Sequence, residues 1–300
     1  VVFATTTPLT AGIPGIFARW LKRTPFVFEV RDLWPELPRA MGMRNPVLLA
    51  AMSALEWMSY RSADRLVGLS PGIVEGIASR GVAKERIAMV PNGCDLDLFA
   101  QSDVAWRPEA VRDDQMLAVF SGTHGLANGL DAVLDAAAVL KARGRDDIRI
   151  ALVGQGREKP RLVARAASEG LHAVLFLDPV PKTKLSGLLA GADLGLQCLR
   201  NLPAFYYGTS PNKFFDYIAA GLPVLNNYPG WLAGLITAHD CGFAVPPDDP
   251  TAMADALICA ANDPARRRKM GVNARALAEA QFSRQLLSTQ WIAWVIRAAR

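Results

Sequence analysis

The chain has 300 residues, enough for two ordinary domains, and 51% of them are hydrophobic against 20% charged, which excludes a largely disordered chain. The net charge of +5 is small and no basic stripe alternates with aromatic residues, so the sequence argues against a nucleic-acid-binding protein. The four cysteines are widely spaced without a C-x-x-C pair, which argues against a disulfide scaffold or a zinc site and favours the reducing cytoplasm.

Short apolar runs alternate along the chain with longer helical patterns, which predicts an α/β fold with parallel sheets. Strands are predicted in the first third of the chain at 1–4, 26–30, 65–69 and 87–90. A second set follows at 117–121, 148–153, 173–177, 194–198, 223–226 and 243–245. The helices predicted among them include 44–61, 127–143, 182–190, 211–220, 251–261, 265–280 and 284–299.

A polar stretch without periodicity at 100–108 is typical of a linker. It divides the chain into two doubly wound, Rossmann-like domains, 1–105 and 106–283, and a C-terminal helix, 284–300, is expected to pack back on the first. Two such domains facing each other form a cleft, and ligands bind at the carboxyl ends of the strands. Because the chain opens inside a strand, we expect the first domain to be incomplete at its N-terminus.

The most informative segment, 208–225, reads as a loop, a short helix and a turn into a strand. Ser210 is a preferred N-cap and Pro211 suits the first helical position. The free N–H groups of that helix start, together with its dipole, form a ready anion site. The segment therefore predicts binding of an anion such as a diphosphate.

The first turn of this helix carries Asn212 and Lys213. A cation is unfavourable at a helix N-terminus, so Lys213 makes sense if an anion is bound there. Asp216 follows one turn later on about the same face, where a carboxylate can accept two hydrogen bonds from a ribose diol. An ordinary Lys213–Asp216 surface pair is the alternative interpretation.

Two strand–glycine–helix junctions are further candidates for ligand contact. Gly122 follows the strand at 117–121, and Gly154 and Gly156 follow the strand at 148–153. Glycines allow a backbone to approach a phosphate closely, although the motif alone is a weak signal. His124, in the first loop, is either a phosphate contact or an ordinary loop histidine.

In the first domain, the strand at 26–30 ends in the loop sequence Arg31-Asp32-Leu33-Trp34-Pro35-Glu36. Sites in α/β folds lie at strand ends, so Asp32 is a candidate contact or base on the acceptor side, with a structural loop carboxylate as the alternative.

On these residues the chain resembles the family-4 retaining glycosyltransferases of the GT-B fold, and more narrowly the bacterial members that build capsule, O-antigen or colanic-acid-type polymers. The segment 208–225 matches the donor-binding helix of that family, in which two glutamates are separated by seven residues. Asp216 falls at the second glutamate, which binds the donor ribose, while Gly208 occupies the place of the first. The Asn-Gly turn after the strand at 87–90 resembles the family's interdomain signature.

The resemblance implies roles for the glycine loops as well. The Gly122 loop supplies an arginine and a lysine to the diphosphate in the family, but here His124 stands near the arginine and Asn128 near the lysine. Lys213 is therefore expected to carry the phosphate charge and, with Asp32, to be a candidate catalytic residue. Gly154 and Gly156 would lie near the nucleotide base. Neither a metal nor a separate cofactor is expected, and front-face attack and double displacement both stay open.

The resemblance implies that the protein transfers a sugar from a nucleotide-sugar donor, expected to be UDP-linked, to a lipid-linked or glycan acceptor. The anomeric configuration would be retained, and the product would serve bacterial surface polysaccharide synthesis. The alternatives are a non-catalytic nucleotide-sugar-binding fragment and a nucleotide-sugar epimerase of related fold. With the first domain incomplete, the chain as given is expected to bind nucleotide but to transfer sugar poorly. Apolar, aromatic and basic residues at 20–23 and 44–61 predict peripheral contact with the anionic inner face of the plasma membrane.

Overall fold

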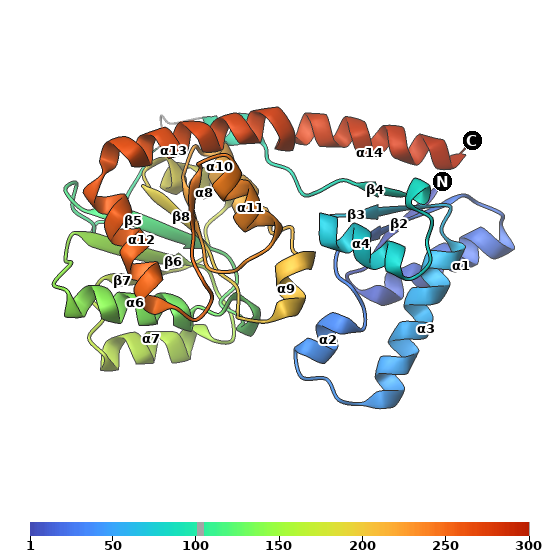
Figure 1. Cartoon of the computed structure of the whole chain (residues 1–300), viewed down its shortest axis with the longest axis horizontal. Helices are drawn as coiled ribbons and strands as arrows, with labels where there is room; N and C mark the ends of the chain where they lie inside the picture. Colours follow the sequence, from blue (N-terminus) through green and yellow to red (C-terminus); the bar gives the residue numbers. More distant parts are fainter. Residues whose placement is uncertain (101–104, 300) are drawn as a thin grey trace. The chain divides into compact units, whose positions relative to one another are not determined.

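The structure is a computed structural model that describes residues 1–100 and 105–299, so 101–104 of the predicted linker and residue 300 lie outside the described residues. The chain forms two compact units (Figure 1). Unit 1 comprises Val1–Gly93, Leu202–Pro211 and Arg284–Arg300, and unit 2 comprises Cys94–Asn201 and Asn212–Ser283. Leu202–Pro211 groups with unit 1, although the sequence places it in the second domain, because α9 (Pro203–Gly208) packs on α2 (Glu36–Ala40) and α4 (Pro71–Ser79).

Unit 1 contains a parallel sheet in the order β1-β2-β3-β4. Its strands are β1 (Val2–Thr5), β2 (Phe26–Val30), β3 (Arg65–Gly68) and β4 (Ile87–Met89). Successive side chains of a strand point to opposite faces, so β2 supplies Phe26 and Phe28 to one core cluster and Val27 to another. Both faces of this sheet are therefore covered, which explains why β2 is almost entirely apolar.

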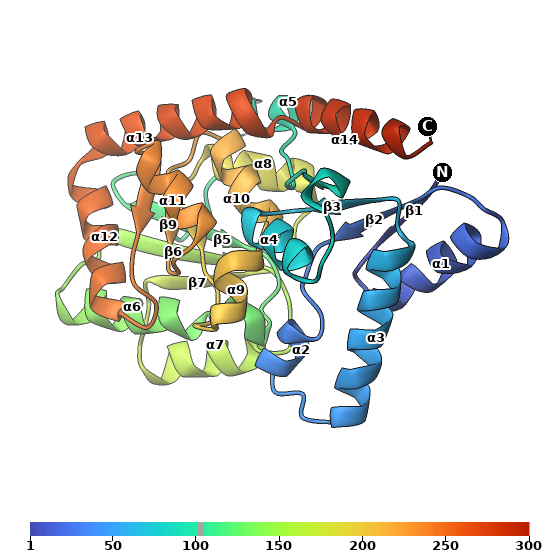
Figure 2. The same ribbon diagram turned by 45° about the vertical axis from the view of Figure 1, so that its right-hand side comes forward.

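Helices from distant parts of the sequence cover the two faces. The face with Phe26 packs against α1 (Gly12–Leu21), α3 (Pro46–Ser62) and α4. The other face is covered by α14 (Arg284–Ala299), which runs beside β2 and β3 (Figure 2). Trp294 Nε1 on α14 donates a hydrogen bond of 3.0 Å to the backbone oxygen of Leu66.

Unit 2 contains a parallel sheet in the order β10-β9-β8-β5-β6-β7. Its strands are β5 (Met116–Ser121), β6 (Ile148–Val153), β7 (Val174–Leu177), β8 (Leu194–Gln197), β9 (Val224–Asn226) and β10 (Gly242–Ala244). The chain winds outward from β5 to β7, then returns to β8 and winds out in the opposite direction. The reversal between β5 and β8 is a topological switch point, where open α/β sheets bind their ligands.

The main core of unit 2 lies between this sheet and α6 (Asp131–Ala142), α7 (Lys159–Ser168) and α12 (Pro250–Asn262), which occupy one side of the sheet in Figure 1. The remaining helices are α5 (Leu96–Ala100), α8 (Lys182–Ala190), α10 (Asn212–Ala219), α11 (Trp231–Ala238) and α13 (Pro264–Leu277), the last continuing into a π-helical turn at Ala278–Phe282. In the described part of the chain, no helix is long and apolar enough to cross a membrane.

All the predicted strands are confirmed to within one or two residues. The helix predicted at 127–143 is wrong at its start, because a 3₁₀ turn at Leu126–Asn128 comes first and α6 begins at Asp131. The break lies at Gly129, whose φ of +56° is left-handed. A Cβ atom there would lie 2.7 Å from the Cα of Arg200, so the close approach of these two backbones requires glycine.

Candidate functional site

The loops after β5 and β6 are pressed together, backbone against backbone. A Cβ atom on Gly154 would lie 1.9 Å from the oxygen of Gly122, and one on Gly156 would lie 2.4 Å from the oxygen of His124. Gly122 and Gly154 have φ values of +151° and +150°, which L-residues rarely adopt. The structure thus brings four predicted site residues together at the carboxyl end of the sheet, and it requires glycine at three of them.

Lys213, in the first turn of α10, reaches this pair of loops. Its ammonium donates a 2.6 Å hydrogen bond to Asn128 Oδ1 and lies 4.2 Å from the ring centroid of Phe120. A Cβ atom on Gly122 would come within 3.2 Å of Lys213 Cε, so the glycine makes room for the lysine. Burial lowers the pKa of Lys213 to about 8, which leaves it largely protonated at neutral pH.

Asp216 lies one turn further along α10 and is buried. Its Oδ1 forms an ion pair of 3.1 Å with the Nζ of Lys182, on α8. The next residue, Tyr217, accepts a 2.8 Å hydrogen bond from the backbone N–H of Ser121 at the end of β5. That bond ties α10 to the strand that carries the Gly122 loop. The pairing with Lys182 had no signal in the sequence, because Lys182 lies 34 positions before Asp216, on a different helix.

His124 is fully buried between Phe120 and Phe176, with ring centroids 6.1 and 6.2 Å away. Burial first, then the charges of Lys159 and Lys213, lower the pKa of its imidazole to about 4. The ring is therefore neutral at pH 7 and supplies no positive charge to a phosphate. Its role as a phosphate contact stays a prediction, and its observed role is to pack the first loop against the second.

Two predicted residues flank the start of α10. Asn212 is exposed at its first position. Ser210 belongs to unit 1, where its hydroxyl accepts a 3.1 Å hydrogen bond from the backbone N–H of Asn92. The hydroxyl thus anchors the predicted Asn-Gly turn, and its capping of α10 stays a prediction.

Asp32 lines a cavity of about 150 Å³ within unit 1. Gly208, which stands where the resembled family has a glutamate, lines the same cavity. Burial raises the pKa of Asp32, while a 3.4 Å hydrogen bond from Thr7 Oγ1 and the charge of Arg31 partly offset that increase. A half-buried carboxylate with a raised pKa beside a cavity can accept a proton.

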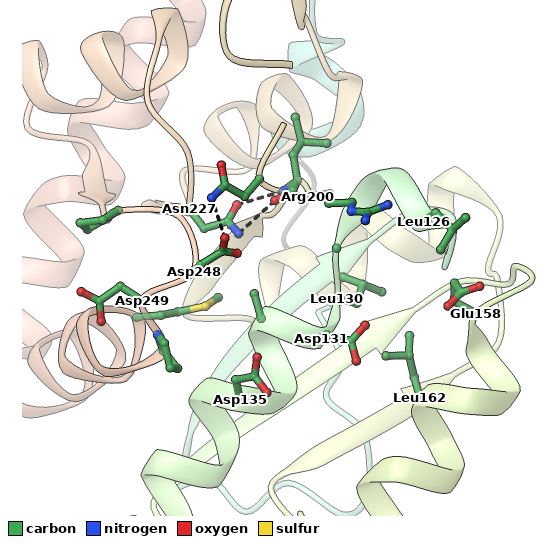
Figure 3. Close-up of a pocket in the computed structure, with 18 of the residues that line it drawn as sticks. Leu126, Leu130, Asp131, Asp135, Glu158, Leu162, Arg200, Asn227, Asp248 and Asp249 are labelled. Carbon is green, nitrogen blue, oxygen red and sulfur yellow. Dashed lines mark hydrogen bonds between the residues drawn. The ribbon is translucent and has the colours of Figure 1, made fainter. Parts of the chain in front are cut away.

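A larger pocket of about 580 Å³, not predicted from the sequence, opens in unit 2 beside the start of α6 (Figure 3). Asp131 and Asp135 line it from α6, and Asp248 and Asp249 line it from the loop before α12. The first two are ion-paired with arginines of α7, and Asp249 accepts a hydrogen bond from the N–H of Ala252 at the start of α12. These carboxylates are therefore largely engaged in holding helices together.

Comparisons with known proteins cover both halves of the chain. Residues 104–277 match the family described as glycosyl transferases group 1, and residues 1–93 match the glycosyl transferase 4-like domain. A D-inositol 3-phosphate glycosyltransferase of Kribbella flavida is 28% identical over 222 residues, which are 70% of this chain and 51% of that protein. The second relative is WcaI of Escherichia coli, whose name describes it as a colanic acid biosynthesis glycosyl transferase. It is 29% identical over 175 residues, which are 56% of this chain and 42% of that protein. The chain thus spans about half the length of these curated relatives.

Among solved structures, HepE of Anabaena in complex with UDP-glucose superposes with a TM-score of 0.79. The match covers 99% of this chain and 78% of that chain at 17% sequence identity. At this identity the likeness establishes the fold alone.

Proposed function

Because the chain belongs to the group 1 glycosyltransferases and shares the GT-B fold, we propose that it transfers a sugar from a nucleotide-sugar donor, UDP-linked by expectation, to a lipid-linked or glycan acceptor. The product would belong to a bacterial surface polysaccharide, as the name of the E. coli relative suggests for that protein. We further propose that the anomeric configuration is retained and that no metal takes part.

The observation that carries this proposal is the environment of Lys213. Its ammonium lies against the Gly122 loop at the start of α10, and no carboxylate among the described residues forms an ion pair with it. A half-buried cation at a helix N-terminus, without a carboxylate partner, is costly unless an anion occupies the site. A bound diphosphate would supply that anion. Asp216 lies one turn after Lys213 on α10, where it could bind the ribose attached to the diphosphate.

The chemistry follows from where charge develops. The bond between the anomeric carbon and the β-phosphate oxygen breaks, and its electron pair stays on that oxygen. The acceptor hydroxyl oxygen becomes bonded to the anomeric carbon and gives its proton to a base. Lys213 and the N–H groups of α10 would stabilise the leaving diphosphate, because preorganised donors aimed at growing charge lower the barrier.

The proposal is tested by combining a binding panel with product analysis. Calorimetry with UDP-, GDP- and TDP-sugars should single out one nucleotide, and incubation of that donor, radiolabelled, with a lipid-linked acceptor should give a labelled glycolipid. Binding without any labelled product would reduce the protein to a nucleotide-sugar-binding module. Label found in an epimerised donor sugar would instead indicate an epimerase.

We propose Asp32 as the base that receives the acceptor proton. Its pKa is raised, so activity should fall as the pH drops through a value above the ordinary 3.8 of aspartate and should be retained above that value. Asp32→Asn should lower kcat/KM by about 10² or more and remove this acidic limb of the pH profile. Glu75→Gln, at an exposed carboxylate on α4, is the control and should leave the profile unchanged. An acidic limb that persists in the asparagine variant would assign it to another group.

We also propose peripheral membrane contact through α1 and α3 of unit 1. Trp20 and Leu21 are 69% and 75% exposed, and Trp57 on α3 is 56% exposed. Beside them, a cavity of about 600 Å³ is lined by four arginines and a single carboxylate, contributed by Arg19, Arg23, Arg61, Arg86 and Asp64. Exposed apolar side chains beside a cationic hollow suit the interface of an anionic bilayer.

Leu21→Glu should weaken co-sedimentation with phosphatidylglycerol vesicles at low salt, because it places a carboxylate at the apolar contact. Val272→Glu is the matched control, since Val272 is 69% exposed on α13 of unit 2. Equal sedimentation of the two variants and the parent protein would remove α1 from the contact surface. No sedimentation of the parent would reject membrane contact altogether.

A further inference from the structure

Asn128, in the loop after β5, contacts the lysine of the proposed site directly. It is the last residue of the 3₁₀ turn Leu126–Asn128 and is buried, with 8% of its surface exposed. Its Oδ1 accepts the hydrogen bond from Lys213, at 2.6 Å, across 85 positions of sequence. The buried amide of Asn128 therefore holds one proton of the half-buried ammonium.

The hydrogen bonds of the Asn128 side-chain NH₂ group fix the orientation of its amide. Asn128 Nδ2 donates to the backbone oxygen of Thr123 at 2.7 Å and to Thr123 Oγ1 at 3.1 Å. The backbone oxygen can only accept and the Lys213 ammonium can only donate, so the NH₂ group must face Thr123 and the carbonyl oxygen must face Lys213. The loop that contains Gly122 and Thr123 thereby determines where the ammonium is held.

The remaining surroundings of the ammonium carry little charge. The ring of Phe120 lies below it, and the backbone of Gly122 passes beside it. The titratable groups that act on it or on its neighbours are the Cys198 thiol, at the end of β8, and His124. Burial raises the pKa of Cys198 to about 12 and lowers that of His124 to about 4, so both are neutral at pH 7. Lys159 acts on His124 from α7, and Asp216 is engaged by Lys182.

We propose that Asn128 is a positioning residue that holds the Lys213 ammonium against the Gly122 loop with a neutral acceptor, leaving its full charge available to a bound diphosphate. This inference rests on the proposed function, because it assigns Lys213 to the phosphates. A carboxylate at position 128 would hold the lysine equally well but would neutralise it. An aliphatic residue would leave the charge intact but release the ammonium.

The test compares Asn128→Asp and Asn128→Ala in the full chain, with magnesium-free pyrophosphate and UDP as probes in calorimetry. Asn128→Asp should weaken the binding of both probes by about tenfold or more, because an ion pair between the new carboxylate and Lys213 competes with the phosphates. Asn128→Ala should weaken them by about three- to tenfold. The control is Asn262→Asp, which makes the same charge change beside another cation of unit 2, since Arg145 donates a 2.9 Å bond to Asn262 Oδ1.

A second measurement reports on the contact itself, without activity or ligand. The reactivity of Lys213 toward acetic anhydride, followed by mass spectrometry across pH, gives the midpoint of its titration, expected near 8 in the parent protein. The midpoint should rise in Asn128→Asp, fall in Asn128→Ala and stay constant in Asn262→Asp. Identical midpoints in all four proteins would overturn the contact.

The binding data separate this inference from the proposed function. Full affinity of the Asn128 variants together with weakened binding by Lys213→Ala would overturn the role of Asn128 alone. Full affinity of Lys213→Ala would overturn Lys213 as the phosphate cation, and with it the proposed site. Loss of affinity in both Asn128 variants, with the shifted midpoints and an unchanged circular dichroism spectrum, would support the positioning role.

Discussion

Asp216→Ala should weaken binding of the nucleotide donor by about 1.5–3 kcal/mol, or roughly 10- to 150-fold, more than any other single carboxylate replacement. The carboxylate is buried one turn below the helix start that would hold the diphosphate. Because it is an ionised acceptor, its hydrogen bonds to a ribose diol would be charge-assisted. Calorimetry on the folded variant measures the effect, and unchanged affinity would contradict the assignment.

Two controls separate ribose binding from the ion pair with Lys182. Lys182→Met removes the partner, whose side chain is 44% exposed, but leaves the Asp216 carboxylate, so donor affinity should change little. Asp255→Ala removes an exposed carboxylate that pairs with Arg143 in the same unit and should have no effect on donor binding. If Lys182→Met weakened binding as strongly as Asp216→Ala, the ion pair rather than the ribose contact would be responsible.

Lys213→Ala should lower turnover by about 10²–10³ and lower donor affinity less, because the charge on the leaving diphosphate is greatest in the transition state. Steady-state kinetics over a range of donor concentrations separates the two effects. Lys141→Ala is the control, since Lys141 is an exposed lysine of α6 that donates to the backbone oxygen of Glu169. Full turnover in Lys213→Ala would mean that another group supplies the positive charge.

Because the pKa of Lys213 is lowered, donor affinity should also depend on pH. In the parent protein, donor affinity should decline as the pH rises through about 8, because the free site loses its charge there, and Lys213→Ala should lose this decline. The stability of the fold should change with pH in the opposite direction to donor affinity. A lysine whose folded pKa lies below the ordinary 10.5 destabilises the fold below about pH 8, and this cost is relieved as the pH rises toward 10.5. Lys213→Met should therefore be at least as stable as the parent at pH 7.

The strands were predictable because they are covered on both faces. Runs such as Phe26–Val30 and Ile148–Val153 are apolar almost throughout, and the helices between them follow a different period. The helix start predicted at residue 127 was too early, because Gly129 adopts a left-handed φ that ends the 3₁₀ turn before α6 begins. What requires glycine there is the backbone of Arg200, more than seventy residues away.

The candidate site was predictable as a set of positions but not as a set of contacts. Gly122, Gly154 and Lys213 are recognisable locally, since glycines after strands and a cation at a helix start are signals within a few residues. Whether they meet depends on the reversal between β5 and β8, which places α10 beside the Gly122 loop. The neutral state of His124 also depends on burial between Phe120 and Phe176, from two different strands.

The amino-acid sequence by itself determined the α/β class, the ten strands and the helix that begins beside Lys213, because each depends on side-chain patterns within about ten residues. The tertiary structure alone decided that Asn128 holds Lys213, that Lys182 pairs with Asp216, and that Asp32 and Gly208 line one cavity. These pairs are separated by 34 to 176 positions, and such distances in sequence are bridged only when strands pair and helices pack.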